Sequence, residues 1–164
     1  MPRVPDVIVP HFDRFVRGPA RLREALLGVG PALLNRRPHG KDWSMRDAVV
    51  HLADAELVQA VQIRFLLAGD EPSLSAWDQD QWKRKLLYVF RDPEAALSSF
   101  QANRYGTAEL LRECAPEAWA REGRHPQLGM ITVAKLMEYA ADHVDEHVMQ
   151  IQAIRVGAQS PADS

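Results

Sequence analysis

Two histidines, His143 and His147, are placed four residues apart inside an apolar repeat. On an α-helix, residues at i and i+4 lie on one face, so both imidazoles can reach a single ion. The same face, read at spacings of three and four, begins at Leu136 and continues to Ile154. Both histidines therefore occupy positions where a helical bundle would normally bury leucine. A metal site built on this pair needs at least one further ligand from another part of the chain.

A second helix supplies a candidate for that ligand. Ser44 and Asp47 form a capping box directly after Trp43, which predicts a helix that starts at this point. Spacings of three and four then place His51 on the buried stripe of this helix, which Gly69 should end. His51 therefore becomes the third inward histidine.

The rest of the pattern predicts an all-α chain that folds as one domain over residues 1–164, with a core from about 12 to 156 and frayed ends. We expect loops at 31–42 and 116–129, and a loop with a short helix at 70–90 that crosses one end of a bundle. Four helices of bundle length are expected, at about 19–30, 44–68, 93–115 and 132–155.

Gly18-Pro19 is expected to separate a short helical piece at 11–17 from the first long helix, because proline fits best in the first turn of a helix. The start of the third long helix is predicted from Asp92, a cap, and Pro93, at the first helical position.

Composition excludes several classes of function. The chain has 164 residues, 46% of them hydrophobic and 26% charged, and a formal net charge of -2, which indicates no nucleic-acid partner. A single cysteine, Cys114, excludes an internal disulfide and a cysteine-rich zinc site. No apolar run approaches the roughly 18 residues that span a bilayer, and the first residues lack the apolar core of a signal peptide. We therefore expect a cytoplasmic protein with a small-molecule substrate and no membrane partner.

Three inward imidazoles suit zinc, nickel, copper or ferrous iron, and they leave coordination positions open for water or substrate. Asp54 lies three residues from His51, and Glu146 three residues from His143. Either carboxylate could orient a ligand ring or act as a base. The alternative is that both are solvated residues on the outer faces of their helices.

Four further residues are candidates for substrate binding, because they combine positive charge with aromatic faces that could hold an anionic, sugar-like molecule. Arg104 falls on or beside the buried stripe of the third long helix, where it could bind an anion or simply extend from the helix edge. The four candidates are Arg64, Trp77, Trp82 and Arg104.

Several stretches resemble the DinB-like superfamily. Residues 43–56 are similar to its helix-2 signature, and His143–His147, followed by Gln150, resembles its helix-4 motif. Residues 77–82 and 129–133 resemble a branch of metal-dependent hydrolases related to bacillithiol transferases. The resemblance covers most of the chain, from about Phe12 to Arg155.

This resemblance implies an up-down-down-up four-helix bundle, often a homodimer, with His51, His143 and His147 around a divalent metal, zinc or nickel first among the candidates. It also implies one of two reactions. In the first, the metal activates a low-molecular-weight thiol for transfer to a small electrophile; in the second, metal-activated water hydrolyses an ester or amide. A non-catalytic metal-binding or stress-response module is the alternative from a different class.

Overall fold

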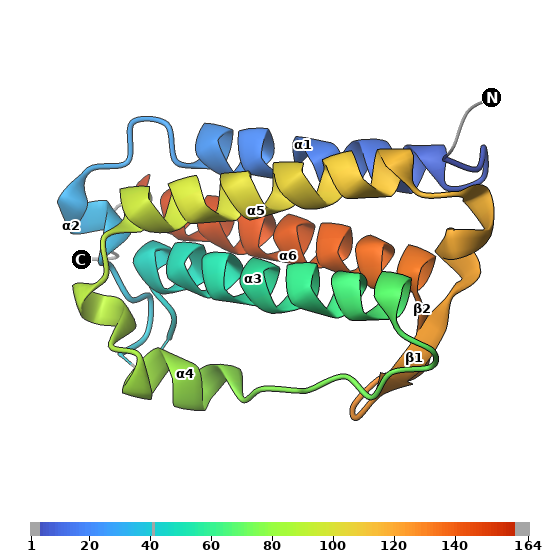
Figure 1. Cartoon of the computed structure of the whole chain (residues 1–164). Helices are drawn as coiled ribbons and strands as arrows, with labels where there is room; N and C mark the ends of the chain where they lie inside the picture. Colours follow the sequence, from blue (N-terminus) through green and yellow to red (C-terminus); the bar gives the residue numbers. More distant parts are fainter. Residues whose placement is uncertain (1–3, 41, 160–164) are drawn as a thin grey trace.

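The computed structural model describes residues 4–40 and 42–159. Four long helices form a bundle (Figure 1): α1 (Val9–Ala25), α3 (Met45–Ala68), α5 (Pro93–Glu113) and α6 (Val133–Gln159). Their connections hold the short helices α2 (Pro31–Leu34) and α4 (Gln79–Lys85), the 3-10 turns η1 (Tyr88–Phe90) and η2 (Pro116–Ala120), and an antiparallel hairpin of β1 (Glu122–His125) and β2 (Gly129–Thr132).

The direction of the helices confirms the expected up-down-down-up topology. In Figure 1, α1 and α6 run one way, whereas α3 and α5 run the other way. Helices α3 and α5 pack side by side, as do α1 and α6, and α3 also packs against α6. Because α3 and α5 are parallel neighbours, residues 69–92 must return along the length of the bundle, and this crossover passes over the α3 side.

Local signals set the starts of α3, α5 and α6, as predicted. Ser44 accepts a hydrogen bond from the Asp47 amide while the Asp47 carboxylate accepts one from the Ser44 amide, so the capping box of α3 is complete. Asp92 caps α5, whose first residue is Pro93. Thr132 accepts from the Lys135 amide at the start of α6. These caps satisfy backbone groups that would otherwise lack partners.

The predicted break at Gly18-Pro19 is wrong, because α1 continues through both residues. A proline inside a helix has no N–H, so the carbonyl four residues earlier, here Phe15, loses its helical donor. Arg104 of α5 replaces that donor: its Nη1 donates to the Phe15 carbonyl at 2.8 Å. Gly18 leaves the space for this approach, since a Cβ at that position would lie 2.8 Å from the same nitrogen.

Gly18→Ala is therefore expected to destabilise the protein by about 1–3 kcal/mol, because the new methyl group must displace a buried guanidinium. Gly106→Ala is the matched control: it is also a helical glycine, but no atom from outside its own helix lies within 4 Å of the added Cβ. That variant should be neutral or more stable by up to about 1 kcal/mol. Urea unfolding of both variants gives the measurement, and equal effects would contradict the role of Gly18.

The connections contain elements that were not predicted: α2 lies in the loop expected at 31–42, and η2 lies in the loop expected at 116–129. The loop expected at 116–129 includes the hairpin of β1 and β2, whose register pairs Gly123 with Ile131. The short helix expected within 70–90 is present as α4, and Tyr88–Phe90 forms a 3-10 turn. The expectation that this segment crosses one end of the bundle is wrong, because it runs along the length of the bundle to reach the start of α5. None of the helices formed by the described residues has both the length and the apolar character needed to cross a membrane.

Candidate metal centre

The three predicted histidines come together between α3 and α6. His51 Nε2 lies 2.9 Å from His143 Nε2, and His147 Nε2 lies 3.2 Å from the same His143 atom. One nitrogen from each ring falls within 4.8 Å of the other two. The rings meet edge to face, with centroids 4.8 Å apart for each of the three pairs. The pairing of α3 with α6 thus places His51 opposite the i, i+4 pair.

A neighbouring side chain orients one of these rings. His147 Nδ1 lies 2.8 Å from Gln150 Oε1, one turn further along α6. Because that oxygen only accepts, the proton of His147 stays on Nδ1 and leaves Nε2 free to bind a metal. Nδ1 of His51 is buried and has no hydrogen-bond partner within the part of the chain that the structure describes.

Aromatic side chains pack against the histidines. The Trp43 ring contacts those of His51 and His147, with centroids 4.9 and 6.0 Å away, and Trp77 lies 5.2 Å from His51. Burial, together with the charges of its two histidine neighbours, lowers the pKa of His51 to about 2. Burial also lowers the pKa of His143 to about 3, helped by His147 and Arg104. The pKa of His147 is lowered too, chiefly by burial.

The arrangement fits a divalent ion. Three neutral imidazoles present their Nε2 atoms to one point, and neutral imidazole is the form that binds metals. Two nitrogens bound about 2.0–2.1 Å from a tetrahedral zinc ion lie about 3.3 Å apart, close to the spacings around His143. Three protein ligands would leave at least one position free, which is typical of catalytic sites.

The same burial predicts that the metal-free protein loses stability in acid. His51 and His143 have lower pKa values in the folded chain than the 6.5 of an exposed histidine. Above pH 6.5 these two rings are neutral in both the folded and the unfolded chain. Below that pH they take up protons only in the unfolded chain. Stability should therefore fall by about 1.4 kcal/mol per pH unit for each ring. Urea unfolding between about pH 6.5 and 5.5 measures the slope. His51→Leu should reduce it by about a quarter to a third, because the pKa values of His147 and His125 are lowered as well; an unchanged slope would contradict the assignment.

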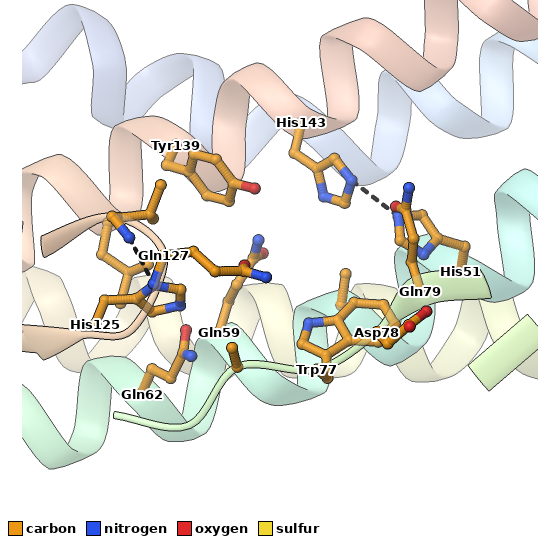
Figure 2. Close-up of a pocket in the computed structure, with 14 residues that line it drawn as sticks. His51, Gln59, Gln62, Trp77, Asp78, Gln79, His125, Gln127, Tyr139 and His143 are labelled. Atoms are coloured by element: carbon orange, nitrogen blue, oxygen red, sulfur yellow. Dashed lines mark hydrogen bonds between the residues drawn. The ribbon is translucent and has the colours of Figure 1, made fainter. Parts of the chain in front are cut away.

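A cavity of about 580 Å³ opens beside the histidines. Its walls come from α3, α6, the crossover around Trp77 and the turn of the β hairpin (Figure 2). His51 and His143 stand at one end, and His125 stands at the other. Among the described residues that line it, Asp78 alone carries a formal charge, and none is Lys or Arg. The cavity therefore suits a small substrate without negative charge.

The four predicted substrate-binding residues have different surroundings. Trp77 lines the cavity, and Trp82 packs against Trp77 with ring centroids 4.5 Å apart. Arg64 is exposed and donates to Thr107 on α5, away from the cavity. Arg104 has no exposed surface and pairs with Glu56, so the structure corrects the interpretation of Arg104 as a ligand for an anionic substrate.

Among the described residues, neither candidate carboxylate, Asp54 or Glu146, forms a hydrogen bond with one of the three histidines. Asp54 pairs instead with Arg91, at 2.7 Å between Oδ2 and Nη1. Burial and the nearby Asp54 carboxylate raise the pKa of Tyr88. Glu146 is exposed, and its charge only partly offsets the effect of burial on the pKa of His147. Gln150 has the orienting position that we expected of a carboxylate.

The cavity residues that were not among the predicted site residues include Gln59, Gln62, His125 and Tyr139. Gln62 follows His51 at the three-and-four spacing of the buried stripe of α3, which is a sequence signal for a polar group in the interior. His125 had no such signal, because its loop was not expected to fold back against α3 and α6.

Comparison with known proteins gives a family and a fold. The model of the DinB superfamily matches residues 14–151. A protein of Oceanobacillus iheyensis with the name "Putative metal-dependent hydrolase" is 24% identical over 137 residues, which cover 83% of this chain and 78% of that protein. YfiT of Bacillus subtilis, which has the same descriptive name, is 23% identical over 134 residues, or 81% and 75% of the two chains.

A solved structure of YfiT, described as an unusual four-helix bundle, covers 93% of this chain with a TM-score of 0.85 at 21% identity, and 89% of the YfiT chain is matched. This likeness shows the fold. The names of the relatives describe those proteins and say nothing further about a substrate.

Proposed function

The chain belongs to the DinB superfamily, and from the convergence of His51, His143 and His147 we propose that it is a metal-dependent enzyme. The observation that carries this proposal is the meeting of three neutral imidazole nitrogens beside a cavity. A structural site would close the coordination sphere with protein atoms, whereas three ligands leave room for a reacting molecule. Zinc and nickel are the proposed metals, because imidazole suits both.

When bound, such an ion acts as a Lewis acid and makes water nucleophilic near neutral pH. The residues of the chain have separate tasks around it. His51, His143 and His147 would hold the ion, and Gln150 keeps the His147 ring in the required tautomer. Trp43 and Trp77 pack against the His51 ring and help to hold it in place.

Hydrolysis of a small uncharged ester or amide is the reaction that the cavity favours. A low-molecular-weight thiol with carboxylates would find no Lys or Arg among the described residues of the wall. Thiol transfer is the second candidate, because three imidazoles leave positions that a sulfur ligand could take.

Cobalt substitution tests both reactions. We expect a cobalt-loaded protein to hydrolyse members of a panel of neutral para-nitrophenyl esters and anilides, with the rate lost in His51→Ala, and its visible spectrum to stay unchanged when cysteine or glutathione is added. A thiol-dependent spectral change with conjugation of an epoxide would favour transfer. Bound metal without turnover in either assay would favour the non-catalytic module. The homodimer stays a proposal, which light scattering of the purified protein can check.

A further inference from the structure

The end of the cavity opposite the metal centre is polar and uncharged. Gln59 and Gln62 face it from α3, and His125 reaches it from the end of β1 (Figure 2). Gln59, Gln62 and His125 are all buried. Burying polar groups costs free energy unless partners are supplied, so the hydrogen-bonding capacity of this end indicates what it binds.

His125 is a fixed hydrogen-bond donor. Its Nδ1 accepts from two backbone amides of the turn, those of Gln127 and Leu128, each at 3.2 Å. Backbone amides can only donate, so Nδ1 carries no proton and the proton of the neutral ring lies on Nε2. Burial lowers the pKa of His125, which favours this neutral form. Figure 2 shows the ring directed into the cavity, on the same side as Gln59 and Gln62.

Two glutamines supply acceptors. Gln62 Nε2 donates to the Ser75 carbonyl at 2.8 Å, which leaves its Oε1 available. Gln59 Oε1 is buried and has no hydrogen-bond partner within residues 4–40 and 42–159. A donor and two acceptors thus share one end of the cavity.

The backbone holds these groups in place. The Arg124 amide donates to the Pro72 carbonyl at 2.9 Å, and the Leu74 amide donates to the Arg124 carbonyl at 2.8 Å. Gly123 lies so close to Pro72 that a Cβ would be 2.6 Å from its carbonyl oxygen. The hairpin that carries His125 and the crossover that carries Ser75 therefore form one unit, so the donor and the acceptors are preorganised.

We propose that this end of the cavity binds an uncharged group that both accepts and donates hydrogen bonds, a carboxamide or a closely similar group, at the far end of the substrate. The amide oxygen accepts from His125 Nε2, and the amide N–H donates to Gln59 or Gln62. A carboxylate would leave the buried Gln59 oxygen without a donor, and no Lys or Arg among the described residues of the wall would balance its charge. Binding of such a group does not depend on the proposed function. Only the statement that the bound molecule is a substrate rests on it.

The test uses the full chain with ¹⁵N-labelled histidine, both as purified and after metal removal by a chelator. Nitrogen shifts of His125 should show the Nε2–H tautomer. Titration with hexanamide should move the His125 resonances, with at least tenfold tighter binding than hexanoate or hexylamine of the same length. Because binding is read in the metal-free protein as well, its failure is distinguishable from failure of the metal-dependent activity.

Two variants complete the test. His125→Phe removes the donor and keeps a ring, and Gln59→Glu keeps an oxygen at the acceptor position but adds a charge. We expect the first to reduce binding of hexanamide at least tenfold, and the second to shift the preference toward hexylamine. The proposal is overturned if hexanoate binds as tightly as hexanamide, if no amide moves the His125 resonances, or if both variants keep the original preference.

Discussion

Replacing His143 by alanine is expected to reduce the metal content of the purified protein from about one ion per chain to a trace. His143 has the central position, because its Nε2 lies 2.9 Å from that of His51 and 3.2 Å from that of His147. Without it the two remaining nitrogens belong to different helices, and two ligands hold a divalent ion poorly. Elemental analysis of the purified variants gives the measurement.

A graded series sharpens this prediction. Gln150→Leu keeps all three ligands but removes the acceptor for His147 Nδ1, and such outer partners are worth about 10–100-fold in metal affinity. His143→Ala should cost more than that, and His51→Ala and His147→Ala should behave like it. His39→Ala is the control, because His39 is an exposed residue of the loop before α3. Full metal occupancy in His143→Ala would show that the ligand set is wrong.

The long helices and the histidine cluster could be predicted because their signals are local. The capping box at Ser44 and the Asp92-Pro93 start each depend on a few consecutive residues. The spacing of His143 and His147 fixes a shared face, and the stripe of α3 puts His51 on the inside of the same bundle. Periodicity placed all three rings inside the bundle, and the expectation that they meet rested on this; the structure brings them together.

The features that were missed depend on contacts between distant parts of the chain. Pro19 is tolerated inside α1 because Arg104, on another helix, donates to the Phe15 carbonyl. His125 enters the cavity because a hairpin of two four-residue strands pairs with the crossover near Ser73. Strands this short have little periodicity to detect. Nothing in the sequence distinguishes Gln59 from an exposed polar residue of a helix, and only the folded structure shows that it is buried.

The buried pair of Arg104 and Glu56 has the largest expected effect on stability. Arg104 Nε and Nη2 donate to the two Glu56 oxygens at 2.9 and 2.5 Å, and neither side chain is appreciably exposed. The guanidinium also lies 4.0 Å from the ring centroid of Phe15 and 5.0 Å from that of Phe100. Those rings belong to the two apolar clusters of the core, so the ion pair joins them.

Arg104→Met is therefore expected to destabilise the protein by about 3–5 kcal/mol, because it leaves the Glu56 carboxylate buried without a partner. The double variant Glu56→Leu with Arg104→Met removes both charges and should recover most of that loss. Recovery will be incomplete, since the Phe15 carbonyl opposite Pro19 still loses its donor. Urea unfolding of the metal-free variants measures both effects. A small loss of stability combined with a large loss of substrate affinity would instead restore Arg104 as a binding residue, and the double variant would then recover nothing.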